Sequence, residues 1–314
     1  MPSLKDPLES HKHFNWKAKA MSPDSSKTGS SHGIVKPLNG WIQDHFKSWD
    51  GTDIFYRFYR VSGARHTVIM LHGYGEYSGR YEKFPGKMGR LSAQFAVMDF
   101  RGMGRSEGVR GSVGSFEDYL GDVTAFVEHL RKKHSIPPKF ILFGHSLGGL
   151  VAACWAMKNP APVKLLILSA PFLGLRFSWI IPSLNRLVLL LKPRCVYKNP
   201  VRSGSLSHDP DEIGIYRKDP LIIRYISARL VEEIARRTGA LRKQPILSVS
   251  FPVHMLVPGE ERIVDSKASR RFFDRLVAPR KERTFFDGFF HEIFNEQDQQ
   301  KAFNVLKTII EDCV

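Results

Sequence analysis

The sequence predicts an α/β protein with a mostly parallel central sheet and helices on both faces. Unbroken apolar runs at 66–71, 140–143 and 164–170 are typical of strands that are buried on both faces. The stretch at 115–133 instead has its apolar residues at helical spacing. Strands that alternate with helices in this way favour a parallel sheet.

The first 40 residues are polar and rich in Ser, Lys, Gly and Pro, without visible periodicity. We therefore expect residues 1–40 to form a flexible N-terminal extension. Regular structure should begin near Trp41. The runs at 42–49 and 53–60 flank the dipeptide Asp50-Gly51, a pattern that predicts a β-hairpin with a tight turn.

The strand at 66–71 leads directly into His72-Gly73-Tyr74-Gly75-Glu76. A glycine-rich loop at a strand end can direct a backbone N–H, here that of Tyr74, at a developing oxyanion. An ordinary glycine turn is the alternative interpretation. The next expected strand, 94–99, continues into a second glycine-rich loop at 99–106, which we assign to the scaffold.

The stretch Gly144-His145-Ser146-Leu147-Gly148 lies between a predicted strand and a predicted helix at 150–157. This is the strand–turn–helix context of a G-x-S-x-G nucleophile elbow. The turn is sharp enough to strain the Ser backbone, and glycines at 144 and 148 let the strand and helix approach each other. Ser146 is therefore the candidate nucleophile, and the backbone N–H of Leu147 should face the same point.

The pattern of strands resumes after residue 245. Strands are expected at 253–257 and 283–286, and an amphipathic helix at 297–312 closes the chain. The loop after the first of these strands carries carboxylates, and the loop after the second carries His291. Ligands of open α/β sheets bind at the carboxyl ends of strands, where these loops should lie.

Several motifs recur together in one order and are more specific jointly than singly. They are Leu71-His72-Gly73-Tyr74-Gly75-Glu76-Tyr77-Ser78-Gly79-Arg80-Tyr81, Asp99-Phe100-Arg101-Gly102-Met103-Gly104-Arg105-Ser106, Gly144-His145-Ser146-Leu147-Gly148-Gly149, Asp219-Pro220-Leu221, Glu261-Arg262-Ile263-Val264-Asp265 and Phe289-Phe290-His291-Glu292. With them the chain resembles the monoacylglycerol lipase and bacterial lysophospholipase branch of the serine aminopeptidase-like α/β-hydrolases, from about Trp41 onward.

The resemblance implies an α/β-hydrolase fold with an inserted helical cap. The core would comprise residues 41–171 and 246–314, and the cap residues 172–245. It also implies a catalytic triad of Ser146, an acid and His291, with an oxyanion hole formed by the N–H groups of Tyr74 and Leu147 beside Gly73. No cofactor belongs to this chemistry, and no Cys/His or HExxH spacing suggests a metal.

The acid departs from the usual pattern of this branch. Most members carry Asp where this chain has Glu261, although the bacterial lysophospholipases have a similar acidic run. Glu261 is the favoured acid, Asp265 is the alternative, and Glu260 is a weaker one. A solvated Glu261 that pairs with Arg262 is the non-catalytic interpretation.

The expected function is hydrolysis of the carboxylic ester of a single-chain lipid, a lysophospholipid or a monoacylglycerol, through an acyl-enzyme. Alternatives that stay open are a general carboxylesterase, a prolyl-type aminopeptidase, and an inactive hydrolase-like module that binds a lipid or a partner. An Asp nucleophile is excluded by Ser146.

The formal net charge of +16 is concentrated in the expected cap. Residues 172–245 contain 14 Lys or Arg and 6 Asp or Glu, and so carry half of the excess. No nucleic-acid motif accompanies the charge, so no nucleic-acid partner is expected. The apolar runs at 177–182 and 187–191, flanked by cations, favour peripheral contact with an anionic membrane or, equally, packing of the cap on the core.

Three cysteines cannot form a disulfide framework, and Cys154 is expected to be a small core residue. No apolar run approaches 18 residues, and residues 1–10 lack the pattern of a secretory signal. We therefore expect a cytoplasmic protein, with a peripheral position at the inner membrane face if the cap binds lipid.

Overall fold

The computed structural model describes residues 40–174 and 180–313. Their main sheet has eight strands in the order β1-β2-β4-β3-β5-β6-β10-β12. β1 pairs antiparallel with β2 and β2 with β4, whereas all other neighbours run parallel. The strands are β1 (Trp41–Lys47), β2 (Asp53–Tyr59), β3 (His66–Leu71), β4 (Ala93–Met98), β5 (Phe140–His145), β6 (Val163–Ser169), β10 (Val253–Pro258) and β12 (Lys281–Phe286).

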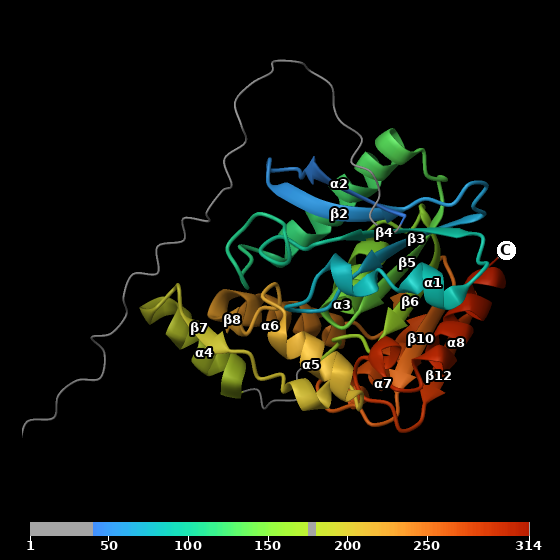
Figure 1. The fold of residues 1–314 in the computed structure, drawn as a ribbon. Coiled ribbons are helices and arrows are strands. Elements are labelled where there is room, and N and C mark those ends of the chain that lie inside the picture. The colour runs from blue at the N-terminus through green and yellow to red at the C-terminus, as the bar shows by residue number, and fades with distance from the viewer. Residues whose placement is uncertain (1–39, 175–179, 314) are drawn as a thin grey trace, which may run out of the picture. The chain divides into compact units, whose positions relative to one another are not determined.

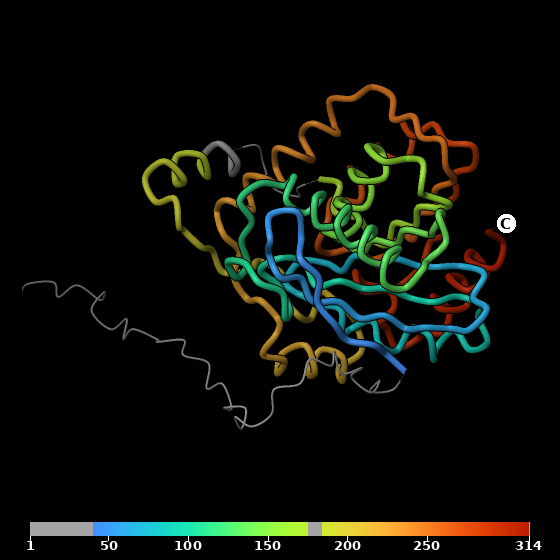
Figure 2. The backbone as a smooth tube through the Cα atoms, turned by 90° about the horizontal axis from the view of Figure 1, so that it is seen from above, coloured from blue at the N-terminus to red at the C-terminus, as the bar shows by residue number. Residues whose placement is uncertain are grey.

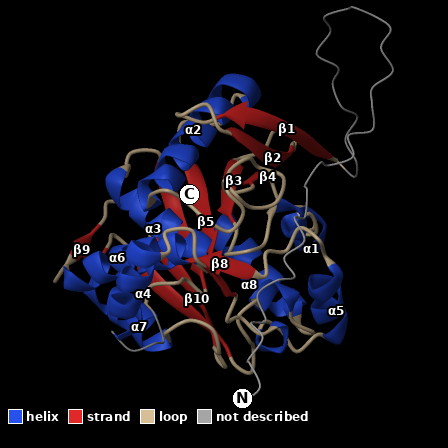
Figure 3. Ribbon diagram, turned by 90° about the vertical axis from the view of Figure 1, so that its left-hand side faces the viewer, coloured by secondary structure: helices blue, strands red, loops and turns tan. Residues whose placement is uncertain are grey.

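Side chains of the central strands alternate between two buried clusters, one on each face of the sheet. Ile69 and Leu142 belong to the first cluster, and their neighbours Val68 and Ile141 to the second. The first is covered by α2 (Phe116–His134), α3 (Leu147–Lys158) and α7 (Ser266–Arg275), and the second by α1 (Phe84–Met88) and α8 (Gln299–Glu311). Figure 3 shows the strands between these two helix groups.

Local chemistry fixes where the helices begin. Ser115 caps α2 with a capping box, in which its hydroxyl accepts from Glu117 N and its own N–H donates to Asp118 Oδ2. α3 is almost wholly apolar and lies buried behind β5, so its start is set by the turn that precedes it.

Between β6 and β10 the described part of the chain adds no strand to the main sheet. It forms α4 (Ile180–Leu191), β7 (Val196–Lys198), α5 (Pro210–Lys218), β8 (Tyr225–Ser227) and α6 (Ala228–Lys243). β7 and β8 pair only with each other in an antiparallel ribbon. Figures 1 and 2 both show α4 and β7, in olive to yellow, on the side of the sheet away from the C-terminus.

The predicted fold class, hairpin, buried strands and closing helix are confirmed, with boundaries within about three residues. The helices α1 and α7 were not predicted, and α4, α5 and α6 were expected only as a helical cap without individual bounds. The proposed 1–40 extension, apart from Gly40, and part of the apolar run at 177–182 lie outside the described residues. Among the residues described, no helix is both long and apolar enough to span a bilayer.

Candidate active site

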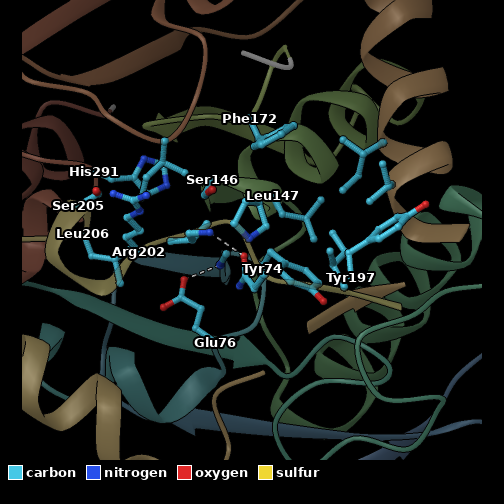
Figure 4. A pocket seen from close by; sticks show the side chains of 18 of the residues that line it. Tyr74, Glu76, Ser146, Leu147, Phe172, Tyr197, Arg202, Ser205, Leu206 and His291 are labelled. Carbon is cyan, nitrogen blue, oxygen red and sulfur yellow. Dashed lines mark hydrogen bonds between the residues drawn. The ribbon is translucent and has the colours of Figure 1, made fainter. Parts of the chain in front are cut away.

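Four loops that leave the carboxyl ends of β3, β5, β10 and β12 meet at one edge of the sheet. They carry Tyr74, Ser146, Glu261 and His291, in that order. Ser146, Leu147, Tyr74, Gly73 and His291 line a single cavity of about 810 Å³. Figure 4 shows the Ser146 and His291 side chains in this cavity, with Tyr74 and Leu147 beside them.

Ser146 has φ 51° and ψ −116°, a conformation that an L-residue adopts only under strain. The glycines on either side permit it. A Cβ at position 148 would collide with the carbonyl oxygens of Leu71 and His72, and one at position 144 with the carbonyl of Gly148. The turn therefore requires glycine at both positions, as the elbow pattern predicts.

The backbone of Ser146 is held at both ends. Its N–H donates to the Ser169 carbonyl at 3.0 Å, and its carbonyl accepts from Leu150 N at 3.2 Å and Phe172 N at 2.9 Å. These bonds join the elbow to the end of β6 and to the first turn of α3. The strained residue is thus fixed by three hydrogen bonds, while its side chain faces the cavity.

His291 Nδ1 donates to Glu261 Oε2 at 2.7 Å, and each side chain is only 3% exposed. The other carboxylate oxygen of Glu261 accepts from the N–H groups of Ile263 at 2.7 Å and Val264 at 3.1 Å. Both oxygens of this carboxylate are therefore engaged, and Nδ1 of the imidazole carries the proton, so that Nε2 can act as a base.

Electrostatics couple these two groups. Burial disfavours a charged His291, but the Glu261 charge and hydrogen bond outweigh it and raise the pKa of His291 above its usual value. Burial likewise raises the pKa of Glu261, but His291 and the two backbone N–H donors outweigh it, so the pKa of Glu261 is lowered. Glu261 therefore stays ionised beside a histidine that is easily protonated.

The alternative acids lie elsewhere. Asp265 is the N-cap of α7, where its Oδ1 accepts from Lys267 N at 2.9 Å. Glu260 accepts from Arg262 Nη2 at 3.0 Å, and Arg262 also lies over the Phe290 ring. Arg262, which the non-catalytic interpretation paired with Glu261, therefore donates to Glu260 instead.

His145 packs against His291, with ring centroids 4.9 Å apart. Burial, together with the neighbouring His291, lowers the pKa of His145 to about 4. His145 is therefore neutral at pH 7 and packs beside the His291 imidazole without adding a charge.

The loop after β3 is folded back on itself. Gly73 N donates to Glu76 Oε1 at 2.5 Å, and a Cβ at position 73 would meet that oxygen at 2.8 Å and the Cβ of Ser146 at 3.3 Å. Glycine thus allows the loop to approach the elbow. The Tyr74 hydroxyl donates to the Tyr225 carbonyl at 2.5 Å, which ties this loop to β8.

A buried ionic cluster beneath the cavity was missed from the sequence. Arg80 donates to both oxygens of Glu292 at 2.6 and 2.8 Å and lies 3.3 Å from Glu76 Oε2. The Arg80 charge overcomes burial and holds the pKa of Glu292 at about 2. Because Glu76 belongs to the β3 loop and Glu292 follows His291, Arg80 joins the two loops of the site. All three residues stand in the motifs quoted above, but their contact depends on folding.

The cavity is lined mainly by apolar side chains, and it extends between the sheet edge and the segment that follows β6. Its apolar lining includes Phe172, Leu184, Val188, Ile226, Val231 and Ile234. Cations also line it, among them Lys198, Arg202 and Arg262. Figure 4 shows the Arg202 side chain in the same cavity as His291 and Ser205. No group of three potential metal ligands gathers in the two described stretches of chain.

Comparison with known proteins identifies a family. The model of the serine aminopeptidase S33 family of hydrolases matches residues 62–298. Phospholipase YtpA of Bacillus subtilis is 26% identical over 79% of this chain and 95% of that protein. The human monoglyceride lipase is 29% identical over 80% of this chain and 84% of the lipase.

Solved structures agree with the fold. The monoacylglycerol lipase of Paleococcus ferrophilus superposes with a TM-score of 0.74 at 26% identity, over 83% of this chain and 99% of that one. A soluble variant of the Saccharomyces cerevisiae monoglyceride lipase, in complex with a substrate analogue, also gives 0.74, at 22% identity over 90% and 97% of the two chains. The latter likeness concerns the fold alone.

Proposed function

The chain belongs to the serine aminopeptidase S33 family of α/β-hydrolases, and we propose that it hydrolyses the ester of a single-chain lipid. Its similarity to the human monoglyceride lipase supports this proposal. The observation that carries this proposal is the buried hydrogen bond from His291 to Glu261 beside the strained Ser146. A nucleophile at a strained turn, a histidine and an acid that orients it are the three parts of a serine hydrolase triad.

In the proposed reaction, Ser146 Oγ attacks the ester carbonyl carbon while His291 Nε2 takes the hydroxyl proton. The carbonyl oxygen becomes the oxyanion, which the N–H groups of Tyr74 and Leu147 stabilise, each by a factor of about 10²–10³ in rate. The imidazolium then gives its proton to the departing alcohol. Water, deprotonated by the same nitrogen, cleaves the acyl-enzyme and regenerates Ser146.

Fluorophosphonate labelling tests this assignment without knowledge of the substrate. We expect an activated serine to form a covalent phosphonyl adduct at Ser146 in the wild-type protein and none in Ser146→Ala. An unlabelled wild-type protein would favour the alternative, an inactive module that binds a lipid or a partner.

The lining of the cavity supports a lipid rather than a peptide substrate. The volume of about 810 Å³ and the apolar walls suit an acyl chain. A peptide amine would require a free carboxylate, but Glu76 and Glu292, the acids in the described lining, both bind Arg80. The general carboxylesterase remains the second candidate, because the same walls accept short esters.

We favour a lysophospholipid over a monoacylglycerol, because Arg202 lines the cavity and has no acidic partner among the described residues. The phosphodiester of a lysophospholipid would supply an anionic partner for this guanidinium. The relative named phospholipase YtpA is compatible with such a substrate.

We also infer that the protein is cytoplasmic and that residues 172–245 form a cap. This cap would rest on the anionic inner face of the membrane. α4 carries Leu190 and Leu191 at 80% and 74% exposed, and Lys192 and Arg194 follow them, both exposed. Apolar side chains beside cations match a lipid interface. Added salt should weaken binding to anionic vesicles; binding that salt does not change would contradict the contribution of these cations.

A further inference from the structure

A second cavity, of about 470 Å³, is lined by other residues of α4 and α6 than those that line the catalytic one. The two helices pack together and contribute different residues to each cavity. Val188 of α4 and Ile234 of α6 line the catalytic cavity, whereas Arg186 and Arg236 line the second one. The α4–α6 pair is therefore a wall shared by both.

Cations far outnumber carboxylates in the described lining of this second cavity, which we call the basic cavity. They come from α4, α6 and α7, and a single carboxylate, that of Asp265, accompanies them. The cations are Arg186, Arg236, Arg242, Lys243, Arg271 and Arg275.

Four of these six side chains already have partners. Arg186 donates to Glu232 at 2.8 Å, Arg236 lies 3.6 Å from Glu233, and Arg271 lies 3.4 Å from Asp265. Arg275 donates to the carbonyls of Leu241, Arg242 and Gln244, and so caps the C-terminal end of α6.

Arg242 and Lys243 have no side-chain hydrogen bond or ion pair within 40–174 and 180–313. Both are exposed, at the end of α6. Carboxylates offset three of the paired cations, and Arg275 binds carbonyls only. Arg242, Lys243 and Arg275 therefore leave an excess of positive charge at the basic cavity, which an anion would offset.

We propose that the basic cavity binds the phosphate of an anionic phospholipid headgroup while the cap lies on a membrane. A membrane source is favoured over a free phosphate by the apolar side chains beside the cavity. Leu190 lies one helical turn from Arg186 and is exposed, and Ile246 and Val277 are 65% and 54% exposed on the segments that follow Lys243 and Arg275.

This arrangement would place a headgroup in the basic cavity and the acyl chain of the substrate in the neighbouring catalytic one. The proposal rests on the membrane contact proposed above, and it adds a discrete headgroup site to that contact. It does not depend on the chemistry of Ser146.

The experiment is flotation with vesicles of phosphatidylcholine, with and without phosphatidylglycerol. For Arg242→Ala/Lys243→Ala we expect binding to the anionic vesicles to weaken by roughly 30-fold, since two cations near an anionic surface contribute about that much. Arg90→Ala/Lys139→Ala is the matched control. These two exposed residues precede β4 and β5 and do not line the basic cavity, and their loss removes the same charge.

If both double variants weaken binding equally, the charge acts diffusely and the proposal is wrong. It is also wrong if inorganic phosphate raises the unfolding temperature of the wild type but not of Arg242→Ala/Lys243→Ala, while vesicle binding is unchanged by the substitution. Unfolding temperatures of all variants show whether they are folded.

Two further variants separate this proposal from the proposed function. Ser146→Ala should bind vesicles as the wild type does, so a failure of the hydrolysis proposal leaves this test intact. Leu190→Ser/Leu191→Ser should lose binding to vesicles of both compositions. If it still binds, the membrane contact through α4 is wrong, and the headgroup site that rests on that contact is wrong with it.

Discussion

His291 Nδ1 and Glu261 Oε2 lie 2.7 Å apart, whereas Asp265, four residues further along the chain, caps α7. The relationship distinguishes two carboxylates that the sequence places in the same loop. Glu261 is one methylene longer than the Asp that most related proteins carry at this position, but it still reaches His291. The loop holds the other carboxylate oxygen with two backbone N–H groups. Replacements at the two positions should therefore have different effects.

Glu261→Gln should lower kcat by roughly 10⁴, because the amide no longer stabilises the imidazolium. The same change should lower the pKa of His291, which the Glu261 charge raises in the wild type. Since the base must be neutral, the acidic limb of the kcat/KM profile should then move to lower pH. Ester hydrolysis measured across pH tests both effects.

Asp265→Asn is the matched control for that substitution. It should retain hydrolysis and its pH profile, and should lose at most about 1 kcal/mol of unfolding free energy through the weaker cap of α7. The reverse pattern, with activity lost at 265 and kept at 261, would make Asp265 the acid.

Arg80→Met should destabilise the protein at pH 7 by about 3–5 kcal/mol, because Glu76 and Glu292 are left buried without their cation. In the wild type the pKa of Glu292 is held at about 2, below its usual 4.5. A lowered carboxyl pKa contributes stability above pH 4.5 that is lost as the pH falls toward 2. The difference in unfolding free energy between Arg80→Met and the wild type, measured by urea unfolding, should therefore become smaller between pH 4.5 and 2. A difference that does not change with pH would show that the stabilisation by Arg80 is not ionic.

Gly148→Ala should prevent the elbow from forming, because the added Cβ meets the Leu71 and His72 carbonyls. We expect loss of probe labelling together with a lower unfolding temperature. Gly214→Ala in α5 is the control, since a Cβ there meets nothing within 4 Å. It should raise the free energy of unfolding by about 0.5–1 kcal/mol, through helix propensity.

Arg202→Ala should lower kcat/KM for lysophosphatidylglycerol by about tenfold, because the charge-assisted hydrogen bond to phosphate is lost. The value for a monoacylglycerol with the same acyl chain should change less than about twofold, as that substrate has no phosphate for Arg202 to bind. Equal losses on both substrates would show that Arg202 acts on cavity shape and not on the headgroup.

The strand ends and the elbow could be predicted from the sequence because their signals are local. Apolar runs mark β3, β5 and β6, and the spacing of Gly144, Ser146 and Gly148 is dictated by contacts within one turn. The choice of Glu261 instead relied on resemblance to related proteins. Its bond to His291 joins positions 30 residues apart, and the spacing of the chain alone does not specify it.

The Arg80 cluster and the basic cavity could not be derived from the sequence. Arg80 meets Glu292 across 212 residues, and the six cations of the basic cavity come from three helices, none of which was predicted individually. The sequence did show excess positive charge in 172–245. Packing determines which of these cations meet a carboxylate and which do not. Short helices such as α1, with Pro and Gly in five residues, give little periodic signal.

The central claim is that Ser146 hydrolyses a lipid ester. The most direct measurement is fatty-acid release from lysophosphatidylcholine and from a monoacylglycerol with the same acyl chain, by the wild type and by Ser146→Ala in parallel. We predict release by the wild type that falls about 10⁶-fold in the folded variant, with the phosphate-bearing lipid preferred. Release that persists in Ser146→Ala, or a wild type that releases no fatty acid from either lipid, would contradict the account.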